Sequence, residues 1–433
     1  MADIPVDIAV FLFNIVLWIL PLIGTIFLAV VAWKLWIHYV QQNFISGIDF
    51  VLLEIVPPRD VLRSPKAMEL FFTNALYHKS TKGGIEEFWQ GAVWFWFSLE
   101  IVSIDGQVHF YIRTPTRIRG LIETQMYAQY PQAQIKEVDD YTLAVDEISD
   151  NSKYNLWGCE FWLDKPEAYP IKTYVDFGLD KDPKEEFKVD PIAPIIELFG
   201  SLKKGEQMWL QFVITPARKK YHTIGTWFKN HDWVAESRLE VRKILKPYMA
   251  VKDEGKRIEV RVPSYLEGQV EGINSKITKL GFDCGIRACY VAKKESYDLS
   301  NRRNLRLIFR QYATPSLNCL ERHNSTQADA FTANFFESFF LISQKTITRL
   351  SNRMLEEYRE RAFFYTPLRH KLSSFIPWPL SPYIFPKYFH HNTFVLNTEE
   401  IATLWHFPGQ ILKVPTLERI ESKEASPPPN LPI

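Results

Sequence analysis

The sequence has few cysteines and almost no net charge, and both shortages narrow the classes of protein that it can encode. Its 51 basic and 50 acidic residues leave a net charge of +1, so the chain lacks the overall basic field typical of nucleic-acid-binding proteins. The spacing of its four cysteines matches no paired CxxC zinc pattern, which favours reduced, mostly buried thiols. Two of them, Cys284 and Cys289, are five positions apart on a predicted strand, so they point to opposite faces. The other two are Cys159 and Cys319.

The sequence also lacks the short motifs of common enzymes. Gly255-Lys256 is not a phosphate-binding loop, because Ala250 replaces the first glycine and Arg257 replaces the hydroxyl residue. No HExxH, GxSxG or kinase-type motif occurs. His390 and His391 point apart in an extended chain, which disfavours a shared metal. We therefore predict no catalytic residue, cofactor or metal, and a protein that is not an enzyme. A membrane enzyme with an unrecognised site stays open as an alternative.

An uncharged run over residues 8–33 stands out from the mixed composition of the rest of the chain. As a helix these residues reach roughly 39 Å, which crosses about 30 Å of hydrocarbon once but not twice. A signal peptide would have a basic start and a shorter apolar core, whereas this start is acidic at Asp3 and Asp7. We expect an uncleaved anchor over residues 1–40, kinked at Pro21.

The charges that flank the apolar run predict its orientation. No Lys or Arg precedes the run, and Lys34 follows it directly. Basic residues concentrate on the cytoplasmic side of a membrane span. The sequence therefore predicts a single-pass protein of the cytoplasmic membrane, with the lipid bilayer as a partner. Its N-terminus would lie outside and the bulk of the chain in the cytoplasm.

Residues 48–150 alternate strand and helix patterns in the order β-α-β-β-α-β. Asp105-Gly106 is a strong hairpin signal between the second and third strands. This order is that of a ferredoxin-like, split-βαβ domain, in which two helices cover one face of an antiparallel sheet. The fold class is therefore α+β. The predicted strands are 50–56, 92–104, 108–113 and 134–138, and the predicted helices are 64–78 and 116–129.

A second α/β domain is predicted over residues 151–318. The succession of strand, Arg-x-Pro, helix, turn and strand at 110–135 recurs loosely at 258–292. A degenerate duplication would explain this internal similarity. Chance is the alternative, because strand–Pro–helix is a common succession. The unit would open with the strand 207–215, contain a helix over 265–280 and end with a helix over 301–312.

The C-terminal region is predicted to be helical and then rich in proline. Residues 319–364 are amphipathic and helical. Residues 365–393 carry prolines among aromatics, which excludes a helix or central strand and leaves a connector or a surface segment. Residues 394–433 contain a helix start at Asn397, with acids in its first turn. They end in a Pro-rich tail, SPPPNLPI, which we expect to be disordered.

Two long stretches of the chain resemble a known family. They are LEIVPPRDVLRSPKAMELFFTNALYH together with residues 98–142, and FVLNTEEIATLWHFPGQ with the tail that follows. Both resemble the non-motor region of membrane-associated type IV secretion and conjugation ATPases of the HerA/FtsK superfamily. The positions that match are Ser64, Pro65, Ala67, Met68, Glu69 and Phe71, and Leu396, Thr398, Glu399, Glu400, Ala402, Leu404, His406, Phe407 and Pro408.

The resemblance implies a non-catalytic, membrane-anchored subunit of a type IV secretion-like or conjugative DNA-transfer apparatus. In that family the motor follows such a segment, whereas this sequence stops at Ile433, so ATP hydrolysis is not carried over. The implied partners are a separately encoded HerA/FtsK-type motor ATPase and other secretion-apparatus subunits, with a homo-oligomer as a further option. The predicted docking residues are Thr398, Glu399, Glu400, Leu404, Trp405, His406, Phe407 and Pro408.

A different class of function rests on the aromatic residues of the predicted sheet. Ferredoxin-like sheets can present aromatic side chains to single-stranded nucleic acid. The candidates here are Trp94, Trp96, Phe110 and Tyr111. On alternating strands half of such residues belong to the core, and the near-zero net charge weighs against this alternative. A membrane-anchored nucleic-acid-binding or general scaffold protein remains the second interpretation.

Overall fold

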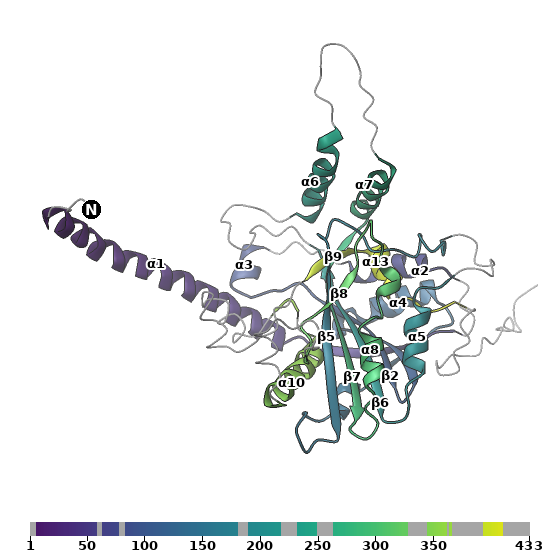
Figure 1. Cartoon of the computed structure of the whole chain (residues 1–433). Helices are drawn as coiled ribbons and strands as arrows, with labels where there is room; N and C mark the ends of the chain where they lie inside the picture. The colour runs from purple at the N-terminus through teal and green to yellow at the C-terminus, as the bar shows by residue number, and fades with distance from the viewer. Residues whose placement is uncertain are drawn as a thin grey trace, which may run out of the picture.

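The computed structural model describes most of the chain as one mixed α+β body with a long N-terminal helix (Figure 1). The described residues are 6–58, 63–77, 83–180, 189–217, 232–248, 263–327, 344–361, 363–365 and 393–409, with side chains described from residue 21 onward. The proline-rich stretch 366–392, the tail 410–433, His390-His391 and the strand predicted over 258–262 lie outside these ranges. So do the loop at Gly255-Lys256 and residues 328–343 of the predicted amphipathic helix.

The N-terminal helix α1, Val6–Ser46, extends away from the body (Figure 1). Its part Pro21–Ser46 is long and apolar enough to cross a membrane, and among the described residues it is the one helix that meets that test. Large apolar side chains of this part face outward, as Phe27 and Leu28 do at 60% and 66% exposure. A helix that leaves such side chains uncovered by its own protein fits an apolar environment.

Among the described residues nine strands form one antiparallel sheet, in the order β4-β1-β3-β2-β6-β7-β5-β8, with β9 pairing β7. The two predicted α/β units therefore share one sheet, joined where β2 pairs β6 over the whole length of β2. The boundary predicted at residues 150–151 divides no sheet. The strands are β1 Phe50–Val56, β2 Phe97–Ile104, β3 Gln107–Pro115, β4 Gln134–Val138, β5 Tyr154–Leu163, β6 Glu206–Pro216, β7 Gly281–Lys293, β8 Leu320–His323 and β9 Phe394–Asn397.

The first half of the chain follows its predicted elements closely. Strand β4 has the predicted bounds, and the predicted hairpin turn is present, with Asp105 and Gly106 at positive φ. The predicted strand 92–104 begins only at Phe97, because Val93 and Trp96 pack in a separate apolar cluster near the base of α1. The helices here are α2 Lys66–Phe71 with the π-turn η1 Phe72–Leu76, α3 Gly84–Phe88, η2 Thr116–Ile118 with α4 Arg119–Gln129, and η3 Tyr141–Ala144.

The second half departs further from the sequence prediction. The helix expected over 301–312 is a short helix followed by a 3₁₀ turn, and the segment 319–364, predicted to be helical, opens with strand β8 on the edge of the sheet. Helices α6 and α7 stand side by side at one end of the sheet (Figure 1). The helices are α5 Ala193–Gly200, α6 Trp233–Leu245 with η4 Lys246–Tyr248, α7 Ser264–Ile277, α8 Leu299–Leu305 with η5 Arg310–Tyr312, α10 Gln344–Glu360 and α13 Thr398–Leu404.

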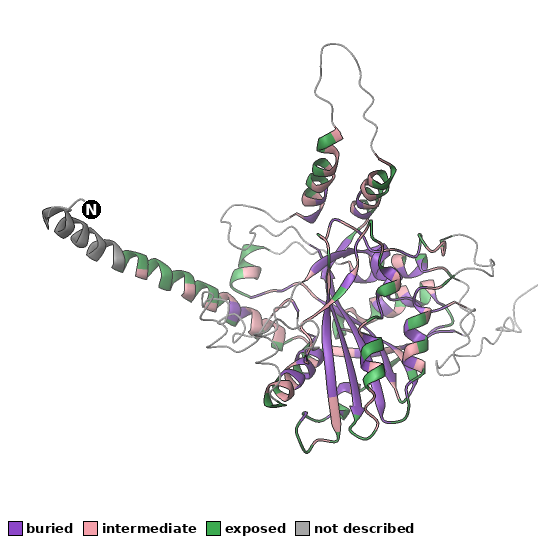
Figure 2. Cartoon of the chain, in the orientation of Figure 1, coloured by how far each residue is buried: buried purple, intermediate pink, exposed green. Residues whose placement is uncertain are grey.

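Helices cover both faces of the sheet, so most strand residues are buried (Figure 2). One face carries the main core, in which α2, η1, α4, α5 and α13 pack on residues from β1 through β7. The opposite face packs against Leu350, Met354, Leu355 and Tyr358 of α10. Cys284 belongs to the first core and Cys289 to the second, which confirms that they point to opposite faces.

Candidate functional site

The predicted docking segment begins with a helix cap that the sequence predicted. The Asn397 side chain accepts a hydrogen bond from Glu400 N at 2.8 Å, and the Glu400 carboxylate accepts one from Asn397 N at 2.8 Å. This reciprocal pair is a capping box, which satisfies two backbone donors that a helix start leaves free. Directly before it, β9 adds to the sheet alongside the N-terminal half of β7. Residues 394–409 are thus built into the body.

All eight predicted docking residues are buried within the chain itself. Trp405 and Glu400 have no exposed surface, and Glu399, the most exposed of those with a measured fraction, retains 8%. In this conformation these side chains contact their own protein and present no surface to a partner. This burial weighs against the set as a docking surface, and its docking role stays a prediction. The apolar residues match the period of a buried helix, which sequence alone does not distinguish from a partner-facing one.

Trp405 is the aromatic centre of this part of the core. Its ring centroid lies 5.7 Å from those of Phe110 and Phe407 and 6.1 Å from that of Phe72. Its indole N–H donates to the Glu100 carbonyl at 3.4 Å. The residue that follows the end of α13 is thereby fixed against a central strand and against η1.

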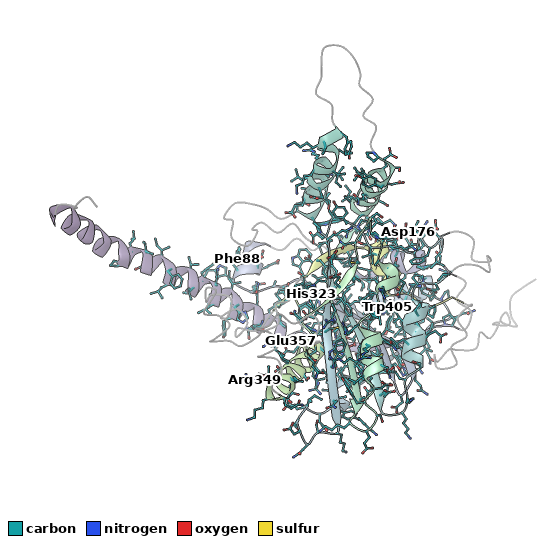
Figure 3. The ribbon with its side chains drawn as sticks, viewed as in Figure 1. Phe88, Asp176, His323, Arg349, Glu357 and Trp405 are labelled. Carbon is teal, nitrogen blue, oxygen red and sulfur yellow. The ribbon has the colours of Figure 1, made fainter. Side chains whose placement is uncertain are left out.

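Two lysines join α13 to the rest of the body (Figure 3 labels the adjoining Trp405). The Lys279 ammonium lies 2.8 Å from Glu69 of α2 and 2.6 Å from Glu399 of α13. Burial alone lowers the pKa of Lys279, but these two carboxylates raise it above its ordinary value. The second pair, Lys276 and Glu400, is fully buried at 3.0 Å. The two stretches that carry the family resemblance, 330 positions apart in sequence (Glu69 to Glu399), therefore meet at one cation.

His406 packs locally and binds Asp190. Its Nε2 lies 3.0 Å from the Asp190 carboxylate, and its Nδ1 lies 2.9 Å from the Ala402 carbonyl. Burial raises the pKa of Asp190, but His406 and the N–H groups of Ile192 and Gly409 outweigh it and hold that pKa below its ordinary value. His406 is thus a fixed core residue at the end of α13.

A row of polar side chains crosses the second face of the sheet, and sequence reasoning missed it. Directly paired positions on eight neighbouring strands all carry a polar residue. Glu100 is the one charged residue of β2, and Glu160 is the one charged residue of β5. A single charge within a mostly apolar strand was the available signal. We name this set the polar row: Lys136, Glu54, Tyr111, Glu100, Gln211, Arg287, Glu160 and His323.

The polar row holds α10 and the residue after it against the sheet. Arg361 Nε donates to Glu100 at 3.0 Å, and its guanidinium also pairs with Asp140. Arg287 donates to the Glu160 carboxylate at 2.9 Å and to the Glu357 carbonyl at 2.9 Å. Buried charges need such partners, since an unpaired one costs several kcal/mol. The row is therefore a structural clamp with every central charge paired.

The aromatic residues proposed for nucleic-acid stacking are mostly enclosed. Phe110 has no exposed surface, and Trp96 and Tyr111 each retain 6%. Tyr111 stacks between His109 and Tyr141, with ring centroids 5.7 Å and 5.2 Å away. Base stacking needs an open aromatic face, so these three side chains offer no platform for a nucleic acid. Trp94 is half-buried.

One group of potential metal ligands lies at the edge of the sheet. The ligand atoms of Asp164, Cys319 and Glu321 are within 4.8 Å of one another, and both carboxylates are exposed. Burial raises the pKa of the Cys319 thiol, which disfavours the thiolate that binds metals. Neighbouring exposed acids are common without a metal, so this group by itself does not indicate a metal site.

Comparison with known proteins places the chain in a family that has no assigned activity. Residues 54–332 match the family model described as a domain of unknown function, DUF8128. No curated protein matches the chain. The matched range runs from β1 to beyond β8 and so contains most of the sheet. Because it spans more than half of the 433 residues, the chain belongs to the DUF8128 family.

Proposed function

We propose that the protein is a non-catalytic, membrane-anchored subunit of a type IV secretion-like or conjugative DNA-transfer apparatus. It would hold a separately encoded motor ATPase at the cytoplasmic face of the membrane. The observation that carries this proposal is the joining of the two resemblance-bearing stretches through Lys279, Glu69 and Glu399. Segments that resemble one family in sequence and form one packed unit support a shared architecture better than either segment does alone.

The strand order supports the finer interpretation of the first half as a ferredoxin-like unit. Strands β4, β1, β3 and β2 are neighbours in that order, and all their pairings are antiparallel. Helices α2 and α4 contribute to the same core on one face. A split-βαβ unit has this arrangement. Its edge at β2 is extended by β6, which turns the unit into part of a larger sheet.

The membrane role rests on α1. Its outward-facing apolar side chains need a hydrocarbon environment, and its connection to β1 is only a few residues long. Lys34 after the apolar run supports an N-terminus outside and a cytoplasmic body. The sheet would accordingly lie close to the inner face of the membrane.

The burial of α13 moves the proposed docking element to the chain after Gly409. The side chains from Thr398 to Pro408 serve the core, whereas residues 410–433 form the Pro-rich segment that precedes the motor in the resembling family. Proline-rich segments are common recognition elements because they lose little conformational entropy on binding. We assign motor docking to residues 410–433.

The test is affinity purification of the full chain from its own host in mild detergent, followed by mass spectrometry. We expect a P-loop ATPase without its own membrane helix to accompany the full chain. Truncation after Gly409 should abolish its recovery, and so should scrambling 410–433 at constant composition, which is the matched control. Equal recovery by all three proteins would overturn docking by the tail, and absence of any such ATPase from the full chain would overturn the function.

A further inference from the structure

A small apolar surface lies where α1 meets the body. It consists of side chains from α1 and from the five-residue helix α3 and the residue after it. Their exposure is high, with Ile85 at 71% and Trp89 at 63%, and Figure 3 labels Phe88 on α3. We name this set the aromatic collar: Trp33, Trp36, Ile85, Phe88 and Trp89.

The position of α3 along α1 is fixed by close contacts. Gly91 has φ +67°, and a Cβ added there would lie 2.2 Å from the Val40 carbonyl oxygen, so only glycine permits the two backbones to approach this closely. The Trp36 indole N–H donates to the Phe88 carbonyl at 3.2 Å. Ring centroids of Trp36 and Trp89 are 5.8 Å apart. The collar therefore moves with α1 as one unit.

The sequence of α1 places the collar at the level of a membrane surface. Lys34 is the first cation after the uncharged run, and cations mark the cytoplasmic end of a span. Trp36 lies three residues, about 4.5 Å, beyond Trp33 along the helix axis. Tryptophan concentrates at the boundary of headgroups and acyl chains, where its apolar ring and its N–H are both satisfied.

We propose that α3 is a second membrane contact, with Ile85, Phe88 and Trp89 lying in the interfacial layer of the leaflet that α1 leaves. The inference rests on the membrane anchoring proposed above and adds a named lipid-binding surface to it. The occupant is lipid because the collar is continuous with the exposed apolar surface of α1. A single stem allows the body to tilt, and a second contact beside it would fix the body against the bilayer.

The contact is expected to be apolar rather than electrostatic. The first turn of α3 carries Glu86 and Glu87, and the Glu86 carboxylate accepts a hydrogen bond from Gly83 N at 3.2 Å. Acidic residues gain nothing from anionic lipids, which attract Lys and Arg instead. Binding of α3 should therefore occur on phosphatidylcholine alone and should be insensitive to salt.

The experiment uses the full chain in phosphatidylcholine vesicles, with an environment-sensitive fluorophore on a single introduced cysteine. Cys319→Ser provides the background, since the other three cysteines are buried and burial raises the pKa of each thiol. The labelled variants are Ile85→Cys on α3 and Phe27→Cys on α1. The control is Leu299→Cys at the start of α8, where the side chain is 57% exposed. This residue follows the C-terminal end of β7, which is the end opposite to the one that pairs with β9.

Vesicles that contain lipids with nitroxides near the headgroup and along the acyl chain quench labels in the interface and in the hydrocarbon, but not labels in water. We expect roughly a twofold loss of emission at residues 27 and 85 and no measurable change at residue 299. Quenching at 27 without quenching at 85 would overturn the α3 contact and leave the anchor intact. No quenching at 27 would overturn both the anchor and the inference that rests on it. Quenching at all three positions would overturn a contact specific to α3.

Discussion

The Arg287 guanidinium lies 2.9 Å from the Glu160 carboxylate across adjacent strands, and neither side chain has any exposed surface. Arg287 also lies over the Phe363 ring, at 4.1 Å from its centroid, and reaches Glu357 at the end of α10. One buried cation thus connects β7, β5 and α10. Its removal would leave the buried Glu160 carboxylate without this cation, whereas Glu357 would keep its ion pair with Arg353 at 2.6 Å.

The substitution Arg287→Met should therefore be strongly destabilising. We expect the free energy of unfolding of the full chain in detergent to fall by about 3–5 kcal/mol, because a buried ion pair that loses one member leaves an uncompensated charge. The measurement is chemical unfolding followed by intrinsic fluorescence. The control Arg119→Met removes a half-buried surface arginine paired with Glu123 and Glu137, and it should change the free energy of unfolding by no more than about 1 kcal/mol. Similar behaviour of the two variants would contradict the clamp.

The substitution Trp405→Ala should lower the free energy of unfolding of the chain, and should not act only by weakening the binding of a partner. Removing a fully buried tryptophan leaves a cavity worth about 3–5 kcal/mol. The matched control is Trp89→Ala, since Trp89 is 63% exposed and its loss leaves no cavity. Thermal unfolding of both variants in the same detergent tests this. A Trp405 variant of full stability that still fails to recover the motor would restore Trp405 to the docking surface.

Acid should destabilise the junction between Asp190 and His406. The folded pKa of Asp190 is lowered, so its contribution to stability is complete above the unfolded value of about 3.9 and disappears as pH falls through the lower folded pKa. Asp190→Asn should flatten the dependence of the unfolding midpoint on pH between about pH 5 and pH 3. An unchanged slope in the variant would show that other carboxylates control acid unfolding.

The contact between Gly91 and α1 gives a prediction with an internal control. Gly91→Ala places a Cβ against the Val40 carbonyl at a positive φ, so we expect a loss of about 1–3 kcal/mol and release of α3 from the stem. Gly120→Ala lies in α4 with nothing within 4 Å of the added carbon and should be neutral or stabilising by up to about 1 kcal/mol. Hydrogen exchange over residues 84–91 reports the release directly.

Local patterns predicted many elements because short-range chemistry decides them. The bounds of β4, the Asp105-Gly106 turn and the cap at Asn397 all follow from propensity and backbone hydrogen bonding. The pairing of β2 with β6 does not, because it joins residues more than a hundred positions apart. A hint was present in β6, which is buried at every position and whose sequence is mostly apolar without a strict alternation of polar and apolar residues. Such runs mark strands that are covered on both faces.

The burial of the predicted docking residues could not be predicted for a related reason. An amphipathic helix shows which face is apolar, but its sequence does not say whether the chain's own core or a partner covers that face. Glu399 and Glu400 were predicted as acids in the first turn of a helix, yet Lys276 of α7 and Lys279, two residues after that helix, pair with them from a distant part of the sequence. The polar row could in principle have been predicted. A shift of any strand by one residue would turn its polar member into the apolar core, so the register that keeps these polar residues on one face is favoured.

The pairing of β9 with β7 also has a mechanical consequence. Tension applied to the chain after Gly409 passes through α13 and β9 into the ladder of backbone hydrogen bonds with β7. From there it crosses the sheet to β1 and enters α1 through the short connection at residues 47–49. No flexible linker interrupts this described path between Gly409 and the stem. The sheet would therefore behave as a stiff connection, and a force applied at Gly409 would reach α1 with little extension of the chain between them.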